Sequence, residues 1–184
     1  MGASMDRSLE GMRNAGLLFV FSVWLQGQMS DLTIFKSNPD LVADFVASSD
    51  RVPQAFAALR SSYWEKQFGE VKNEFYQAFS AELNRQEVKE IDEIFHVRNM
   101  IGHAHISLGR DYMLYRPAGD KKERAVIEAL NPQQIEDQAD PVMLVLEFWR
   151  PEIFKNLSDK IGRIDQGCFS RLAGQVGVPH GRIR

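Results

Sequence analysis

Residues 68–83 read FGEVKNEFYQAFSAEL, and this stretch decides the fold class. Its apolar side chains recur every three or four residues, at Phe68, Val71, Phe75, Phe79 and Leu83. That spacing puts them along one face of a helix and leaves the charged side chains on the opposite face. The stretch therefore predicts an amphipathic helix that buries one side in a helical core.

Helical patterns continue on both sides of this stretch. We expect further helices over residues 6–28, 40–46, 53–63 and 86–107, and a last apolar stripe from Ile153 to Leu172. The Asn131-Pro132 and Asp140-Pro141 pairs resemble helix starts. Residues 142–149 are apolar without a clear period, so the sequence is compatible with either a helix or a strand in this segment.

One segment has the alternation of a β-structure. Residues 112–115 and 125–127 flank the turn-forming residues 117–121, which predicts a β-hairpin over about 111–128. The predicted class is mainly all-α: an up-and-down helical bundle with a short β-hairpin inserted before the C-terminal helices. We expect one domain over residues 6–174, a C-terminal tail over 175–184, and a cloning remnant or disordered start over 1–5.

Composition excludes several classes of protein. The 184 residues include 22 Lys or Arg and 25 Asp or Glu, whereas a generic polyanion binder is usually much more basic. A single cysteine, Cys168, excludes a disulfide framework within the chain and a zinc site of several thiolates. The apolar run from Leu17 to Leu25 contains only nine residues. A helix needs roughly 17 to 25 apolar residues to span a bilayer. We therefore expect a cytoplasmic protein with no membrane partner.

Residues 96–105, HVRNMIGHAH, contain three of the four histidines. At about 100° per residue, Arg98 falls within the apolar face of its helix. A guanidinium in that position costs free energy unless it is paired or faces a polar interface. The apolar residues around it on the wheel are Ile91, Ile94, Phe95, Ile101 and Gly102.

Structural roles for these residues stay open. Arg98 pairs with Glu90, Glu93 or an acid from another helix if its role is purely structural. His103 lies about 140° from Arg98 on the helical wheel, so the two share no face and meet only if the Arg side chain reaches around. The neighbouring acidic residues are expected to form a solvated face rather than a metal site.

Arg98, Asn99 and His103 are spaced as in the HEPN superfamily, which this chain resembles over about residues 6–172. The family signature is an Arg, four to six residues, then a His, often with a polar residue directly after the Arg. The resemblance implies a helical bundle, a homodimer whose paired motifs form one active site, and ribonuclease activity, often in toxins or defence effectors. One toxin branch carries a Tyr two residues after the His, where this chain has His105, so regulation by modification of that Tyr is in doubt here.

The chemistry follows from the residue types. RNA cleavage without a metal needs a base, an acid and a cation near the phosphorane. Imidazole suits both proton roles, and guanidinium binds phosphate bidentately. Residues 96–124 carry six Lys or Arg against three acids, a locally basic zone on an acidic chain. We therefore predict Arg98, Asn99 and His103 as catalytic residues, and His105, Arg110 and Arg116 as substrate-binding residues.

The predicted function is a metal-independent endoribonuclease with no metal and no cofactor. It would cleave RNA by attack of the 2′-hydroxyl and leave a 2′,3′-cyclic phosphate. The expected partners are a second copy of the chain, an RNA substrate and an antitoxin protein. The alternative is a catalytically silent HEPN-like dimer that binds RNA, a nucleotide or a partner protein. A third reading is a helical interaction protein in which Arg98 is structural.

Overall fold

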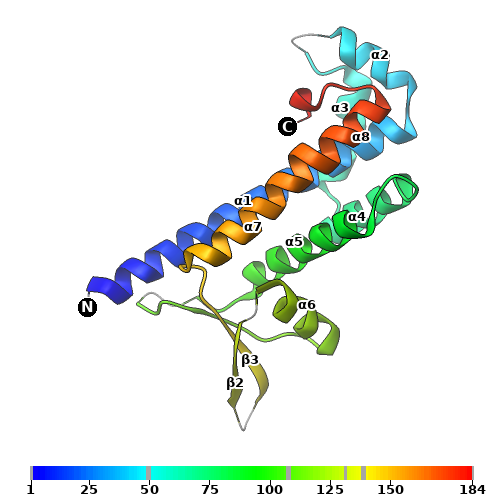
Figure 1. Cartoon of the computed structure of the whole chain (residues 1–184). Helices are drawn as coiled ribbons and strands as arrows, with labels where there is room; N and C mark the ends of the chain where they lie inside the picture. Colours follow the sequence, from blue (N-terminus) through cyan, green and yellow to red (C-terminus); the bar gives the residue numbers. More distant parts are fainter. Residues whose placement is uncertain (1, 49–50, 107–108, 131, 138–139, 184) are drawn as a thin grey trace. The chain divides into compact units, whose positions relative to one another are not determined.

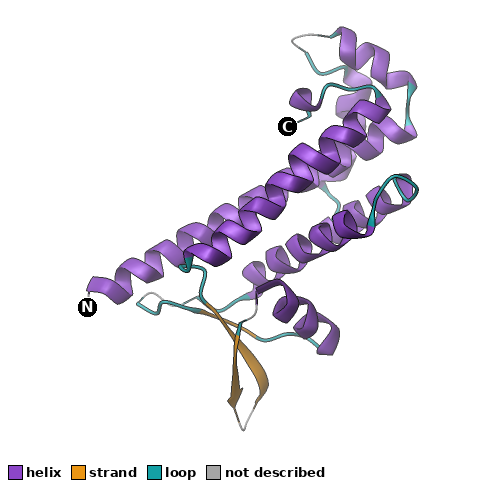
Figure 2. Ribbon diagram, in the orientation of Figure 1, coloured by secondary structure: helices purple, strands orange, loops and turns teal. Residues whose placement is uncertain are grey.

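The computed structural model describes the chain except residues 1, 49–50, 107–108, 131, 138–139 and 184 (Figure 1). Most of the described residues are helical, and a small antiparallel sheet precedes the last helices (Figure 2). This confirms the predicted fold class. No helix among the described residues is both long enough and apolar enough to cross a membrane.

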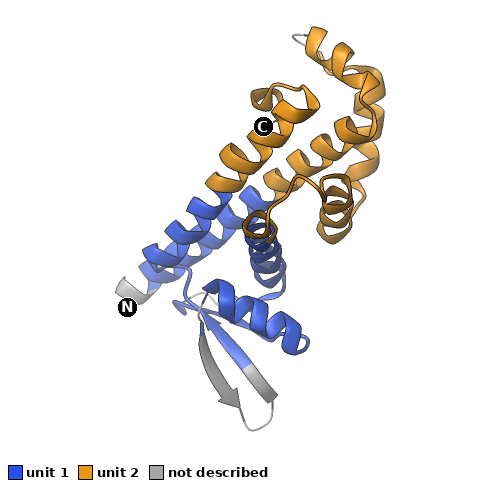
Figure 3. Cartoon of the chain, turned by 45° about the vertical axis from the view of Figure 1, so that its right-hand side comes forward, with its two compact units in different colours: residues 1–22, 89–161 blue, residues 23–88, 162–184 orange. Residues whose placement is uncertain are grey.

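The chain forms two compact units (Figure 3). Unit 1 contains residues 1–22 and 89–161, and unit 2 contains residues 23–88 and 162–184. The sequence predicts one domain over residues 6–174, and both units take residues from that range. Helices α1 (Gly2–Ser37), α5 (Arg85–His103) and α7 (Pro151–Arg163) each contribute residues to both units.

Unit 1 joins parts of α1, α5 and α7 to a three-stranded sheet and helix α6 (Asp120–Leu130). The strand order is β1 (Met113–Tyr115), β3 (Asp140–Leu146), β2 (Gln133–Asp137), with antiparallel pairing throughout. Leu114 lies opposite Val145 in β3 and also forms a bridge with His105 on its other side. The buried Asn14 side chain donates to the carbonyl of Phe148 at 2.9 Å and holds α1 against the segment after β3.

Unit 2 contains α2 (Asp40–Ala47), α3 (Gln54–Trp64), α4 (Phe68–Ala78), the π-helix η1 (Ile164–Phe169), α8 (Ser170–Val176) and the 3₁₀-helix η2 (His180–Arg182). Its core is rich in phenylalanine. Phe35 and Phe56 stack with centroids 4.6 Å apart, and Phe75 contacts Phe169 edge to face at 5.5 Å. The stripe of residues 68–79 is buried as predicted.

Several helix bounds agree with the sequence predictions. Helices α2, α3 and α5 begin within one residue of the expected positions, and Pro151 occupies the first position of α7, where its missing N–H costs least. The final stripe extends from α7 through η1 into α8. The segment expected as a tail, 175–184, packs Val178 and Ile183 into the core of unit 2.

The predicted hairpin at 111–128 is wrong in its second half. Residues 125–127 belong to α6, where Val126, Ala129 and Leu130 are buried at helical spacing. The hairpin of the structure is β2–β3 instead, so the helix starts expected near 132 and 140 are strands. Helix α1 begins at Gly2, within the residues 1–5 that the sequence suggests as a cloning remnant or disordered start. Helix α5 ends at His103, four residues before the expected end.

Candidate active site

Arg98 lies half-buried on α5, in unit 1. Its guanidinium carbon is 5.2 Å from the centroid of the Phe19 ring of α1, a cation–π distance. Its Nη1 donates to Oδ1 of Asn99 over 3.0 Å. Its Nε is buried and has no hydrogen-bond acceptor among the described residues. The side chain is therefore held in one place while part of its donor capacity stays unused.

The local sequence explains why Arg98 is held in this way. Ile94, Val97 and Met100 are buried, and they anchor α5 in the core of unit 1. Arg98 follows Val97 directly and therefore lies at the border of the buried face. The ring of Phe19 also reaches the turn that follows, because a Cβ at Gly102 would lie 4.0 Å from Cε2 of Phe19.

The ion pair with Glu93 that a structural Arg98 would use is not formed in the structure. The Glu93 carboxylate lies 2.6 Å from Nζ of Lys160 on α7 and 3.8 Å from Nζ of Lys89. Glu90 is buried and takes part in other interactions. Within the described residues, Arg98 makes no ion pair with a carboxylate.

His103 is the last residue of α5, and its side chain is exposed. No hydrogen bond joins its ring to Arg98 or Asn99 within the part of the chain that the structure describes. The structure therefore brings Arg98 and Asn99 together and leaves His103 open to solvent, five residues further along the same helix. One protomer presents one imidazole at this position.

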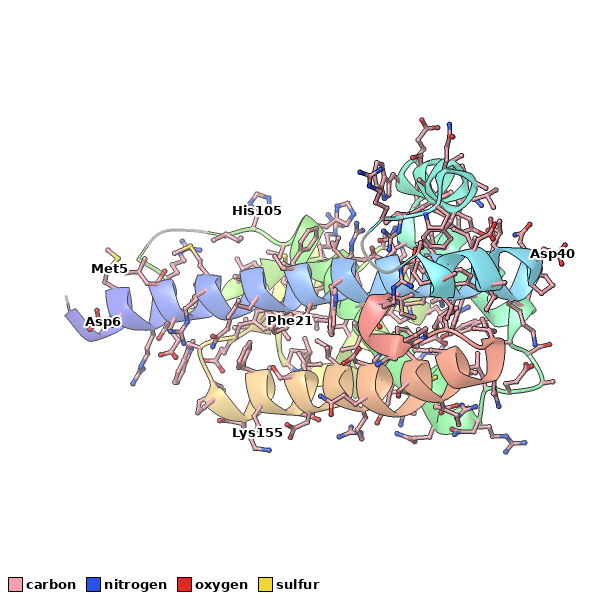
Figure 4. All side chains as sticks on the ribbon, turned by 90° about the horizontal axis from the view of Figure 1, so that it is seen from above. Met5, Asp6, Phe21, Asp40, His105 and Lys155 are labelled. Atoms are coloured by element: carbon pink, nitrogen blue, oxygen red, sulfur yellow. The ribbon has the colours of Figure 1, made fainter. Side chains whose placement is uncertain are left out.

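The three predicted substrate-binding residues lie beyond the end of α5. His105 is exposed, and its backbone exchanges two hydrogen bonds with Leu114, at 2.7 and 3.0 Å. Figure 4 shows its ring projecting away from the ribbon. Arg110 and His105 line the same pocket, whereas Arg116 is exposed directly after β1 and does not line it.

Two features of this region were not assigned to the site from the sequence. Phe19 belongs to an apolar run that reads as buried core, and nothing in the sequence pairs it with Arg98, 79 positions later. Tyr112 reads as a strand residue, yet it lines the pocket with His105 and Arg110.

A second pocket, of about 430 Å³, lies where β3 leads into α7 and includes Phe148, Arg150 and Ile153.

Comparison with models of known protein families, with curated proteins and with solved structures finds no match to this chain.

Proposed function

We propose that this chain is a metal-independent endoribonuclease that works as a homodimer in the cytoplasm. One observation carries the proposal: the half-buried Arg98 guanidinium is held between Phe19 and Asn99 without a carboxylate partner among the described residues. An exposed imidazole, His103, follows on the same helix. A fixed guanidinium is suited to a phosphate, and an imidazole is suited to proton transfer near neutral pH.

In the proposed reaction, the 2′-oxygen of the RNA attacks the adjacent phosphorus. One imidazole takes the 2′-hydroxyl proton, the P–O5′ bond breaks, and a second imidazole donates a proton to O5′. The products are a 2′,3′-cyclic phosphate and a 5′-hydroxyl. Arg98 offsets the negative charge that develops on the phosphorane, and Asn99 orients the guanidinium through the 3.0 Å hydrogen bond.

The need for two imidazoles supports a two-fold dimer, because each protomer supplies one His103. Helix α1 offers a surface for this dimer, which we call the α1 stripe: Met5, Leu9, Met12, Gly16 and Val20. These residues recur at spacings of three and four, so they share one helix face. Leu9 is 53% exposed and Val20 60% exposed, and exposed apolar residues that adjoin on one face are typical of interaction surfaces.

Phe19 borders the α1 stripe and contacts Arg98. Symmetric packing of two α1 stripes would therefore bring two Arg98 side chains and two α5 helices close to one axis. In the view of Figure 4, the labelled side chain of Met5, on the stripe, and that of His105, in the segment after α5, both lie above the α1 ribbon. We expect this symmetric packing to form the composite active site between the two protomers.

A second candidate function is a silent dimer that binds RNA without cutting it. The observation that favours it is the separation of His103 from Arg98 within one protomer, since no hydrogen bond joins them among the described residues. The two candidates differ in one result. The silent dimer would bind RNA and leave it intact under every condition tested.

The proposed function is tested by incubating the purified protein with mixed RNA in EDTA, alongside the His103→Ala variant. We expect fragments with the wild type and none with the variant. Equal cleavage by both proteins would contradict the role of His103, and binding without cleavage by the wild type would favour the silent dimer. If the protein acts as a toxin, its expression should slow growth, and the same variant should relieve this effect. An antitoxin partner is part of that toxin hypothesis.

A further inference from the structure

Unit 1 contains a small pocket of about 290 Å³. Its lining residues begin at His105, two residues after His103 in the sequence. Six residues line it: His105, Ile106, Arg110, Tyr112, Leu114 and Met143. They come from the segment after α5, from β1 and from β3. The pocket is therefore built on the sheet, and the paired backbones of His105 and Leu114 hold one wall in position.

The chemistry of this pocket suits a flat aromatic group attached to a phosphate. Ile106, Leu114 and Met143 form apolar walls, and Tyr112 adds an aromatic ring. The guanidinium carbon of Arg110 lies 5.8 Å from the centroid of that ring. Aromatic rings and guanidinium planes are the groups on which proteins stack unpaired bases, and cations beside them contact the backbone.

The size of the pocket also points to a single base. Its volume of about 290 Å³ lies near the lower end, about 300 Å³, of pockets that hold small ligands, which leaves room for one nucleobase. A folded peptide segment or a base pair needs more room. One base with its attached phosphate matches both the volume and the polar groups that line the pocket, the Arg110 guanidinium and the His105 imidazole.

The position along the chain connects this pocket to the candidate active site. One residue, Ala104, separates His103 from His105, so their Cα atoms lie at most about 7 Å apart. A phosphate at His103 and a base in the pocket would therefore belong to the same nucleotide or to neighbouring ones.

We propose that the Tyr112–Arg110 pocket binds an unpaired nucleobase next to the cleaved phosphate, and that the substrate is therefore single-stranded RNA. The inference rests on the proposed ribonuclease function for its link to cleavage. Bases in a duplex are stacked and paired, so only an unpaired nucleotide enters such a pocket without first being extruded.

The test uses the full chain and a short single-stranded 2′-O-methyl RNA, which the proposed reaction cannot cut. Replacing Tyr112 by leucine keeps an apolar side chain and removes the aromatic ring, and Tyr112→Phe is the matched control that keeps the ring. We expect Tyr112→Leu to weaken binding about tenfold, the effect of losing one stacked base, and Tyr112→Phe to bind as the wild type does. Binding of a blunt duplex should be the same for all three proteins.

A series of oligonucleotides with one abasic nucleotide at successive positions identifies the base concerned. In the wild type, one abasic position should weaken binding about tenfold, and the same position should have no further effect in Tyr112→Leu. Thermal unfolding of Tyr112→Leu shows whether its fold is kept, and with the fold kept the coupling assigns the abasic effect to Tyr112. The wild-type series alone also tests the pocket without any substitution.

The outcomes separate this inference from the proposed function. If the wild type cuts RNA but Tyr112→Leu binds single strands equally well, or no abasic position matters, the base pocket is wrong and the ribonuclease proposal stands. If the wild type never cuts RNA but shows the Tyr112-dependent coupling, the pocket stands and the ribonuclease proposal fails. Equal affinity of the wild type for duplex and single strands would overturn the preference for unpaired substrate.

Discussion

The ring of Phe19 on α1 lies beneath the guanidinium of Arg98 on α5, with the guanidinium carbon 5.2 Å from the ring centroid. The contact holds a cation on an aromatic face, and the hydrogen bond to Asn99 fixes its rotation. A guanidinium in a salt bridge donates its paired N–H groups to the carboxylate. The Arg98 guanidinium makes no such pair among the described residues and keeps N–H donors available. That difference is the physical basis for assigning Arg98 to a phosphate rather than to the stability of the fold.

Replacing Arg98 by alanine should lower the rate of RNA cleavage by about 10²- to 10³-fold, because the developing charge on the phosphorane loses its main cation. Arg98→Lys should also be poor, since lysine lacks the bidentate fork. Arg85→Ala, an exposed position on the same helix, is the matched control and should keep full activity. Cleavage rates are compared at saturating RNA, and full activity in Arg98→Ala would refute its role.

Replacing Phe19 by leucine should slow cleavage by roughly two- to fivefold, the effect of losing a cation–π contact at a partly exposed site. Phe19→Tyr keeps the ring and should keep the rate. Both variants are compared by single-turnover cleavage and by thermal unfolding. A rate in Phe19→Leu equal to that of the wild type would show that the contact with Arg98 has no part in the reaction.

A charge on the α1 stripe should separate the proposed dimer. Val20→Glu would bury a carboxylate between two apolar faces, so the protein should sediment as a monomer at micromolar concentration and lose cleavage activity. Val46→Glu on α2 places the same change at an exposed valine outside the stripe and should leave the dimer intact. A wild-type protein that is already monomeric at this concentration would contradict the composite site.

The thiol of Cys168 should resist alkylation in the folded protein. Burial, and then the negative charge of Glu87, raise its pKa from 9.0 to about 12. At pH 8 the thiolate fraction is then roughly a thousandfold lower than in the unfolded chain, and the alkylation rate should fall accordingly. The stability that comes from keeping this thiol protonated is present below pH 9 and is lost as the pH rises toward 12. Alkylation of the native protein is followed by mass spectrometry. If Cys168 is alkylated as fast in the native protein as in the unfolded chain, the thiol is not buried as described.

The helical part of the fold could be predicted because its signal is local. The stripe of residues 68–79 and the bounds of α2, α3 and α5 follow from spacing and from the residues at the helix ends. The hairpin could not be placed in the same way. Val126 and Ile127 are β-branched and suggested a strand, but Val126 is buried together with Ala129 and Leu130 on one helix face.

The candidate site could be predicted only in part, for the same physical reason. The helical wheel places Arg98 within the apolar face of its own helix, whereas in the structure it lies half-buried at the border of that face. The ring that holds it comes from Phe19, which is far away in sequence, and the base pocket needs β1 and β3 to be paired. Such contacts arise from tertiary packing, which a local pattern does not encode.

The most direct measurement uses an RNA in which the single 2′-hydroxyl at the cleaved position is replaced by hydrogen, with EDTA present. The 2′-hydroxyl is the proposed nucleophile, already tethered beside the phosphorus, so its loss should abolish cutting at that bond and spare other sites. The unmodified RNA should give a 2′,3′-cyclic phosphate and a 5′-hydroxyl. Continued cleavage at the deoxy position, or a requirement for added magnesium, would contradict the proposed mechanism.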